Sequence, residues 1–347
     1  MSQESAPTGV LLLNLGTPDA PHTREVRRYL AEFLSDPRVL DIPALPRWLL
    51  LHGYILRTRP RASAAQYRKI WTEAGSPLLV HSQALEHGVA ESLGEGFRVE
   101  LAMRYGRPDI RAAIEALCAA RVARIVLLPL FPQFSEAATG SAVARVRELI
   151  EARADAPPLQ ILGDFHDHPG FIEAFAQVAR PELERFRPDH VLFSYHGLPE
   201  RQIRASDPNG AHCFASGGCC DAVGAPNRLC YRAQCFATSR ALQASLDLSA
   251  EGCSVAFQSR LGRTPWIRPY TDVRLPELAA GGVRRLAVLC PAFVADCLET
   301  VEEIAIRARD QWQALGGEAL ALIPSLNAHP TWVATVAGMV RQIAVQP

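Results

Sequence analysis

The strongest constraint on the fold is a regular alternation of short apolar segments with amphipathic ones. The apolar segments are rich in Val, Leu and Ile and have the length of a buried strand; they are 9–15, 97–105, 123–131, 159–165, 189–196, 253–259, 284–291 and 318–324. Amphipathic helix candidates lie between them, at 22–34, 108–120, 139–152, 170–185, 296–312 and 330–344. Apolar strands that alternate with helices predict parallel sheets covered on both faces.

The two halves of the chain resemble each other. GVLLLNLGTP (9–18) and HVLFSYHGLP (190–199) each combine a buried strand with a small residue and a proline before a helix. We therefore expect an α/β fold of two similar domains facing across a cleft. The predicted boundaries are 1–165, completed by a C-terminal helix at 326–347, and 166–325. In open parallel sheets, ligands bind beyond the carboxyl ends of the strands.

Charge and motifs exclude several classes of function. Basic and acidic residues balance at 36 each, so we expect no nucleic-acid partner. Neither half contains G-x-G-x-x-G or a Walker A motif, which argues against a nucleotide cofactor. The N-terminus lacks a basic n-region, and no segment reaches the roughly 18–20 apolar residues that span a bilayer. A cytoplasmic protein is therefore expected, with cysteines as thiols or metal ligands.

Residues 41–60 interrupt the alternation. They include the apolar side chains Trp48, Leu49, Leu50, Leu51, Tyr54, Ile55 and Leu56 and the flanking bases Arg47, Arg57, Arg59 and Arg61. One interpretation is a helix packed into the core. The other is an apolar lip with basic flanks, which rests on a membrane or admits a flat apolar ligand.

His196 ends a predicted strand, and Gly197 and Pro199 favour a sharp turn into a helix. A histidine at this place would point into the cleft and titrates near neutrality, so it could accept a proton. The alternative is a structural histidine bonded to a main-chain carbonyl.

A second set of polar residues lies on the predicted helix 296–312. At about 100° per residue, Asp296, Glu299 and Glu303 fall within one sector of about 60°. Opposite them lie the apolar residues Leu298, Val301, Ile304, Ala305 and Ala308. The pattern is typical of a solvated helix face, and it also suits carboxylates that guide a divalent cation or relay protons.

The sequence closely resembles bacterial ferrochelatases. The resemblance rests on LNLGTP (13–18), QYRKIWTEAGSPL (66–78), MRYGRP (103–108), FPQFS with TGS (131–141), FSYHGLPER (193–201), FQSRLGRTPWIRPYTD (257–272) and CPAFVADCLETVEEI (290–304). These segments occur in family order and span nearly the whole chain.

The resemblance implies two Rossmann-like domains with a porphyrin between them. It also implies a lyase of haem biosynthesis, which inserts Fe²⁺ into protoporphyrin IX and gives protohaem and two protons. Fe²⁺ is then a substrate, and no cofactor is required for the chemistry. Alternatives are a chelatase for another tetrapyrrole, such as coproporphyrin, or a non-catalytic haem- or metal-binding protein. The oligomeric state is not predicted.

Metal insertion needs a base near the macrocycle and weak ligands for the incoming ion, which His and carboxylates provide; the same set would also suit metal-assisted hydrolysis. His196 matches the family histidine assigned to proton abstraction or metal ligation, and Glu299 matches the glutamate paired with it. Asp296 and Glu303 match the further acidic residues that accompany this glutamate in the family. In the family these residues lie on a π-type helix. All four are therefore predicted to contact the metal.

Other positions match the porphyrin-binding residues of the family. They are Leu15, Tyr67, Arg104, Tyr105, Phe131, Phe134, Ser135, Trp266 and Phe293. Arg104 and Ser135 could bind a propionate, and the apolar residues would cover the macrocycle unless they only pack in the core. The family also favours a lip at 43–57, hence a peripheral contact at the inner face of the membrane. Cys297 departs from relatives that carry histidine there.

Residues 207–235 form a Cys- and Gly-rich insertion. It contains Cys213, Cys219, Cys220, Cys230 and Cys235 in the pattern C-x5-C-C-x9-C-x4-C, which is no simple C-x2-C zinc ribbon. Some ferrochelatases carry a [2Fe–2S] cluster, often on C-terminal cysteines, which this sequence lacks. We expect an internal cluster on four of the five, with Cys235 the weakest candidate. Zinc or reduced thiols are the alternatives. Cys118, Cys253 and Cys290 are predicted core thiols.

Overall fold

The computed structural model describes residues 6–262 and 264–345. Within that range the chain forms two parallel four-stranded sheets, in the orders β2-β1-β3-β4 and β6-β5-β7-β8. It divides into two compact units: Met1–Phe131, Glu136–Asp164 and Asn327–Pro347 make unit 1, and Pro132–Ser135 and Phe165–Leu326 make unit 2. The predicted α/β fold with two parallel sheets is confirmed. The outermost residues of the predicted ranges 1–165 and 326–347, namely 1–5 and 346–347, lie outside the described residues.

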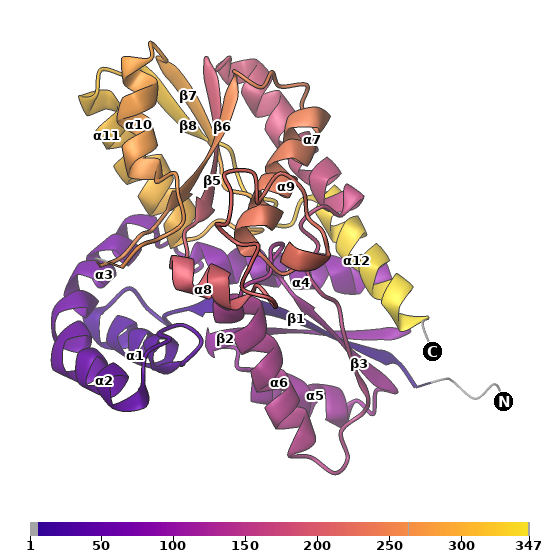
Figure 1. Ribbon diagram of the computed structural model, residues 1–347. Helices are drawn as coiled ribbons and strands as arrows, with labels where there is room; N and C mark the ends of the chain where they lie inside the picture. The colour runs from indigo at the N-terminus through magenta and orange to yellow at the C-terminus, as the bar shows by residue number, and fades with distance from the viewer. Residues whose placement is uncertain (1–5, 263, 346–347) are drawn as a thin grey trace. The chain divides into compact units, whose positions relative to one another are not determined.

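Unit 1 is a sheet with helices on both faces (Figure 1). Its strands are β1 (Thr8–Thr17), β2 (Phe97–Gly106), β3 (Arg124–Pro129) and β4 (Leu159–Ile161). Its helices are α1 (Thr23–Ser35), α2 (Ala44–Leu50), the π-helix η1 (Leu51–Ile55), α3 (Leu56–Ile70), α4 (Pro77–Leu93), α5 (Ile110–Ala119), the π-helix η2 (Glu136–Gly140), α6 (Ser141–Glu151) and α12 (Pro330–Ala344). Helices α5 and α6 pack on one face, and α4 and α12 pack on the other.

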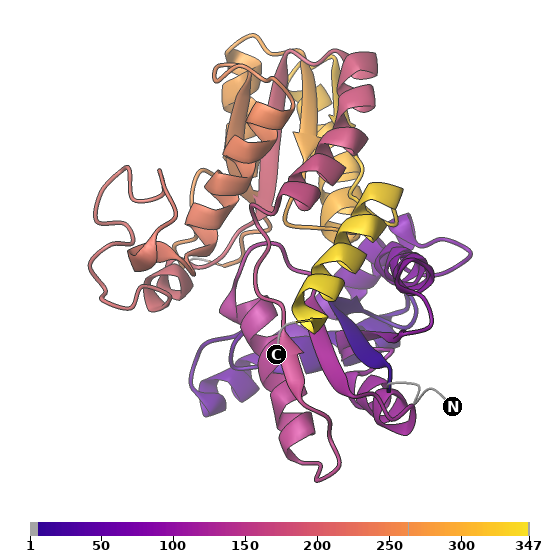
Figure 2. The same ribbon diagram turned by 90° about the vertical axis from the view of Figure 1, so that its right-hand side faces the viewer.

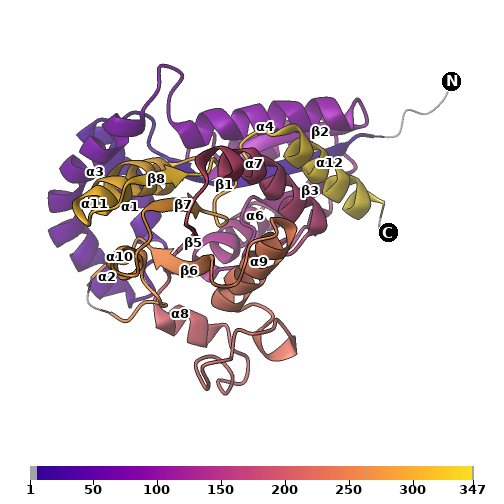
Figure 3. The same ribbon diagram turned by 90° about the horizontal axis from the view of Figure 1, so that it is seen from above.

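Unit 2 repeats this architecture. Its strands are β5 (His190–His196), β6 (Cys253–Gln258), β7 (Arg285–Leu289) and β8 (Ala319–Leu322). Its helices are α7 (Pro169–Phe186), α8 (Glu200–Ala205), the 3-10 helix η3 (Ala225–Asn227), α9 (Tyr231–Ser245), α10 (Thr271–Ala280), the π-helix η4 (Leu298–Ala308) and α11 (Arg309–Ala314). Helices α10, η4 and α11 cover one face, while α7 and α9 lie on the other (Figure 3).

The helix predicted at 296–312 departs from the geometry of about 100° per residue and has the π-type geometry that the family resemblance implies. Its first part is the π-helix η4 and only its end, α11, is α-helical. The wider turn changes which residues face the core, so the prediction of an apolar face is only partly right. The buried positions are Thr300, Glu302, Ile304 and Ala308.

The segment 41–60 is largely exposed, which contradicts a helix packed entirely into the core. Leu45, Trp48, Leu49 and Tyr54 are each more than half exposed, at 68%, 58%, 55% and 63%. The opposite side anchors the segment, because Leu51, Ile55 and Leu56 are buried together with Leu34 of α1. No helix in the described part of the chain is long and apolar enough to cross a bilayer.

Candidate functional site

His196 is the last residue of β5, at the carboxyl edge of the unit 2 sheet. Its ring Nδ1 lies 2.6 Å from the main-chain oxygen of Gly197. Since a carbonyl oxygen only accepts hydrogen bonds, Nδ1 must be the donor, and the neutral ring then carries its lone pair on Nε2. A bond to a main-chain carbonyl is what the structural interpretation of His196 predicts, and it also leaves Nε2 as a basic nitrogen, so the functional role of His196 stays a prediction.

Two aromatic rings flank the half-buried imidazole. The ring centroids of Trp266 and Phe293 lie 6.5 Å and 6.4 Å from that of His196. Trp266 is held in place because its indole N–H donates to the oxygen of Leu261 at 2.8 Å and its main chain pairs with Pro199. These apolar surfaces suit a flat aromatic ligand beside the base.

The π-helix η4 contributes the carboxylates. Glu299 is half-buried in its first turn. Beside it is the thiol of Cys297; burial raises the pKa of this thiol, and the adjacent Glu299 carboxylate raises it further. Cys297 therefore remains a neutral thiol at neutral pH.

Asp296 and Glu303 are bonded to protein donors. Asp296 accepts from the Thr300 hydroxyl at 3.1 Å and from the Ser325 N–H at 3.3 Å. Glu303 accepts from the main-chain N–H of Ser259 at 2.9 Å, and its other oxygen accepts from the Ser259 hydroxyl. An incoming cation would compete with these bonds.

No three or more His, Cys, Asp or Glu side chains in residues 6–262 and 264–345 are grouped so that they could hold a metal ion. His196, Glu299, Asp296 and Glu303 all belong to unit 2, at the ends of β5 and β7 and on the following helix. Their roles as metal contacts remain predictions.

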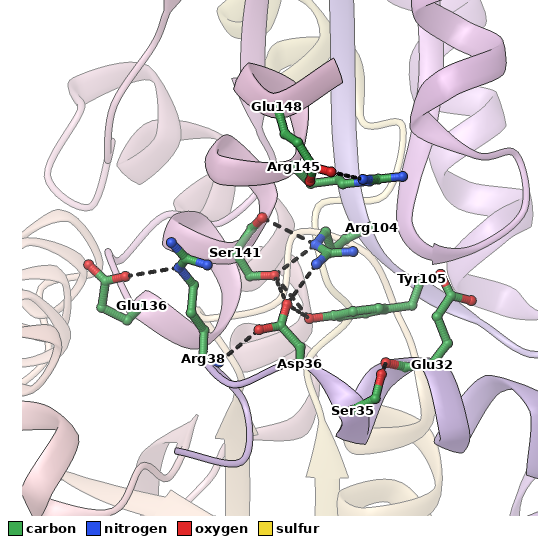
Figure 4. Close-up of polar contacts among 10 residues, drawn as sticks. All are labelled: Glu32, Ser35, Asp36, Arg38, Arg104, Tyr105, Glu136, Ser141, Arg145 and Glu148. Carbon is green, nitrogen blue, oxygen red and sulfur yellow. Dashed lines mark hydrogen bonds and ion pairs between the residues drawn. The ribbon is translucent and has the colours of Figure 1, made fainter. Parts of the chain in front are cut away.

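In unit 1, Arg104 and Tyr105 meet at a buried carboxylate that the sequence analysis missed (Figure 4). One oxygen of Asp36 accepts from Arg104 at 2.6 Å, from Ser141 at 2.6 Å and from Tyr105 at 3.0 Å, and the other accepts from the Arg38 N–H at 2.7 Å. Burial would raise the pKa of Asp36, but these hydrogen bonds and the charge of Arg104 lower it overall. A propionate bound by Arg104 would therefore share the guanidinium with Asp36.

The other predicted porphyrin-binding residues differ in exposure. Tyr67 and Ser135 are buried, while Leu15, Phe131 and Phe134 are half-buried. Leu15, Tyr67 and Phe131 belong to unit 1, whereas Phe134 and Ser135 belong to unit 2. Of these, Phe131 packs against the core of unit 1, so core packing accounts for part of its surface.

The Cys-rich insertion 207–235 is mostly irregular, and Figure 2 shows it as a long loop before α9. All five of its cysteines are buried. The Sγ atoms of Cys219 and Cys220 lie 3.8 Å apart, and Cys213 and Cys220 each interact with Cys230. Cys235 instead interacts with the Tyr231 side chain. Pairwise contacts thus link four of the thiols and leave the fifth apart, but no three of these described cysteines are grouped so that they could hold a metal ion.

Two features organise the insertion. Asp207 accepts from the main-chain N–H groups of His212 and Cys213 at 2.7 Å and 2.8 Å, which closes its first turn. Arg232 donates to the Cys220 sulfur at 3.1 Å. The hydrogen bond with Cys230 and burial raise the pKa of the Cys220 thiol, and the Arg232 guanidinium offsets this only in part, so Cys220 is a neutral thiol in this structure.

Three further residues connect parts of these sites, and the sequence alone did not identify them. They are Asp36, Tyr231 and Gln258. The Tyr231 hydroxyl donates to the His196 oxygen at 2.9 Å, and the Gln258 amide donates to the Glu299 oxygen at 2.7 Å. All three act through main-chain or buried polar contacts, which sequence periodicity does not reveal.

Comparisons with known proteins give one family. The Ferrochelatase family profile matches residues 7–344. A ferrochelatase of Coxiella burnetii (strain Dugway 5J108-111) is 49% identical over 334 residues, covering 96% of this chain and 93% of its own. A ferrochelatase of Legionella pneumophila (strain Paris) is 46% identical over 335 residues, covering 96% and 98%. Among solved structures, SirB from Bacillus subtilis with Fe3+ has a TM-score of 0.55 at 11% identity, over 98% of this chain and 96% of its own, which supports the fold.

Proposed function

Because this chain belongs to the ferrochelatase family and is therefore a lyase of haem biosynthesis, we propose that it inserts Fe²⁺ into protoporphyrin IX. Iron and a porphyrin are its substrates by family membership, and the choice of protoporphyrin IX is the proposal. The products are protohaem and two protons. The observation that carries the assignment of the centre is the imidazole of His196, oriented by its bond to Gly197 and close to the rings of Trp266 and Phe293.

His196 is the residue that we propose to receive a pyrrole proton or to bind the metal. Its Nε2 carries the lone pair in the neutral ring, since Nδ1 is bonded to Gly197. Both roles need the same lone pair, so the geometry is compatible with either. Two pyrrole protons must leave as the metal enters, and a base beside the ring lowers the barrier to that step.

Glu299 is the proposed partner of His196, with Asp296 and Glu303 behind it. Carboxylate oxygens bind Fe²⁺ less tightly than thiolates or imidazole clusters do, so they can pass the ion to the porphyrin. The donors that already occupy Asp296 and Glu303 would keep these ligands weak. Phe293 and Trp266, whose rings lie beside the imidazole, would contact the macrocycle.

The test is an anaerobic assay of Fe²⁺ insertion into protoporphyrin IX and coproporphyrin. We expect turnover with protoporphyrin IX, and a loss of at least about 100-fold in kcat for His196→Ala and for Glu299→Ala. Faster insertion into coproporphyrin would overturn the substrate proposal. Tight haem binding without insertion by the wild type would instead indicate a binding protein.

A [2Fe–2S] cluster on the insertion is a further part of the proposal. Such a cluster needs two pairs of thiolates, one pair for each iron. Cys219 with Cys220 and Cys213 with Cys230 provide two contacting pairs. The Arg232 guanidinium beside Cys220 offsets part of the negative charge of thiolate ligands.

We also propose that the exposed lip, residues 43–57, rests on the inner face of the membrane, with the rest of the chain in the cytoplasm. Its support is the set of more than half-exposed side chains Leu45, Trp48, Leu49 and Tyr54. Arg57, the last residue of the lip, and Arg61 are exposed in α3, where they can bind lipid phosphates. Contact with the bilayer would place the enzyme beside an apolar substrate.

A further inference from the structure

We propose that Gln258 is a positioning residue, which fixes the main chain at His196 and at Glu299 and so sets the geometry of the catalytic pair. This inference rests on the proposed function of those two residues. Gln258 is the last residue of β6 and is 3% exposed. It therefore cannot contact a bulky substrate, and it acts through the residues that it holds.

On the β5 side, Gln258 holds the turn that carries the histidine. It is the register partner of His196 in the parallel pair of β5 and β6. Its main-chain oxygen accepts the N–H of Gly197 at 2.8 Å. That approach is close, because a Cβ on Gly197 would lie 2.9 Å from the same oxygen. The end of β5 is thus fixed immediately beyond the imidazole.

On the other side, the Gln258 side chain reaches η4. Its Nε2 donates to the main-chain oxygen of Glu299 at 2.7 Å. The next residue, Ser259, has a φ of +66° and bonds the Glu303 carboxylate through its N–H and its hydroxyl. Gln258 and Ser259 therefore form hydrogen bonds to η4 at Glu299 and at Glu303, about one turn apart.

A buried chain of hydroxyls orients the amide. The Ser194 hydroxyl donates to Gln258 Oε1 at 2.7 Å, and it lies 2.9 Å from the Thr271 hydroxyl. Because Ser194 has one proton and gives it to Gln258, Thr271 must be the donor to Ser194. This order leaves the amide N–H₂ facing the Glu299 carbonyl. The Cys290 thiol also donates to Oε1, at 3.7 Å. These buried donors favour one orientation of the amide.

The test compares Gln258→Met, which keeps the size of the side chain and removes its hydrogen bonds, with Gln243→Met. Gln243 also donates to a main-chain oxygen, that of Leu248 at 3.2 Å, but lies near the end of α9. We expect kcat of Gln258→Met to fall by about 10- to 100-fold with KM for the porphyrin changed less than about twofold. Gln243→Met should retain the wild-type kcat.

A double-mutant cycle separates positioning from general destabilisation. If Gln258 acts through Glu299, Gln258→Met should cost little further activity in a Glu299→Ala background. An equal fold-loss in both backgrounds, or a wild-type kcat for the folded single variant, would overturn the inference. Wild-type turnover by Glu299→Ala and His196→Ala would instead refute the proposed function.

Should Gln258→Met fail to fold, Ser194→Ala provides the second variant. It removes the shorter of the two bonds that Oε1 accepts, and the longer bond from the Cys290 thiol remains. We expect Ser194→Ala to lower kcat by less than Gln258→Met does. In the Glu299→Ala background, Ser194→Ala should cause no further loss. Unchanged kcat in a folded Ser194→Ala protein would contradict the proposed orientation of the amide and with it the inference.

Discussion

The hydroxyl of Tyr231 donates a hydrogen bond to the main-chain oxygen of His196 across 2.9 Å. Tyr231 is the first residue of α9 and directly follows Cys230, one of the four associated thiols. Burial raises the pKa of Tyr231, so the phenol stays protonated and remains a donor. The Cys-rich insertion is thereby tied to the strand end that carries the imidazole.

Tyr231→Phe removes this bond and leaves the His196 oxygen without its phenol donor. We expect a loss of about 1 kcal/mol in the free energy of unfolding and a severalfold lower kcat. Urea unfolding and steady-state assays measure the two effects. Tyr54→Phe, on the exposed lip, is the control and should change neither. An unchanged kcat for Tyr231→Phe would mean that the bond has no influence on the imidazole.

Asp36→Asn should destabilise unit 1. The carboxylate is almost fully buried and pairs with Arg104, whose charge would be left without its counterion. Breaking a buried pair in this way costs about 3 kcal/mol. Asp155→Asn, in an exposed pair with Arg153, is the control and should cost less than about 1 kcal/mol. Equal losses in the two variants would show that the Asp36 network is not a stabilising one.

The same carboxylate predicts a pH dependence of stability. The folded-state pKa of Asp36 is lowered, so its contribution is complete above the unfolded pKa of about 4 and is lost as pH falls through the lower folded value. The difference in unfolding free energy between wild type and Asp36→Asn should therefore shrink below about pH 4. Urea titrations from about pH 6 to about pH 3 test this, and a constant difference would contradict it.

If the lip contacts the membrane, the protein should bind phospholipid vesicles. Trp48→Ser combined with Leu49→Ser removes two large exposed apolar side chains. We expect at least about tenfold weaker binding to vesicles with anionic lipid, since burying each is worth about 1.5–3 kcal/mol. Leu315→Ser, which alters an exposed leucine in unit 2, is the matched control. Equal binding by the lip variant and the wild type would place the membrane contact elsewhere.

If the insertion holds a [2Fe–2S] cluster, the purified protein should be coloured. Its visible absorption should bleach on reduction with dithionite. Cys213→Ser and Cys230→Ser should lose this absorption together with bound iron, whereas Cys235→Ser should keep both, because Cys235 interacts with Tyr231 instead. Iron and sulfide analysis accompanies the spectra. A colourless, iron-free and active wild type would refute the cluster.

The sheets were predictable from the sequence because their signal is local. Continuous runs such as Val10–Leu13 are fully buried in β1, as their composition indicates. The π-helix was not derivable from periodicity, since a pattern of charged residues does not distinguish 100° per residue from a wider turn. The exposure of Trp48 could not be predicted either, because an apolar helix has the same sequence pattern whether it is buried in a core or exposed on a surface.

The candidate centre was predictable only in its charged residues. His196 and Glu299 stand out by residue type at strand and helix ends. Asp36, Tyr231 and Gln258 do not, because each owes its role to partners that lie 35 or more positions away in the sequence. Such contacts form only after the strands have taken their order, and no local pattern encodes them.

The C-terminal helix α12 has a consequence for synthesis of the chain on the ribosome. Its side chains Trp332, Val336 and Val340 are buried, and Val333 packs so closely on α4 that a Cβ on Gly88 would lie 3.1 Å from it. Unit 1 thus begins with the first strand translated and acquires its last core residues only after all of unit 2 has been made. We infer that the part of this face that α12 covers stays open in the nascent chain, with only α4 packed beside it, until unit 2 has been made. Chaperone demand should therefore be greatest during elongation of the second unit.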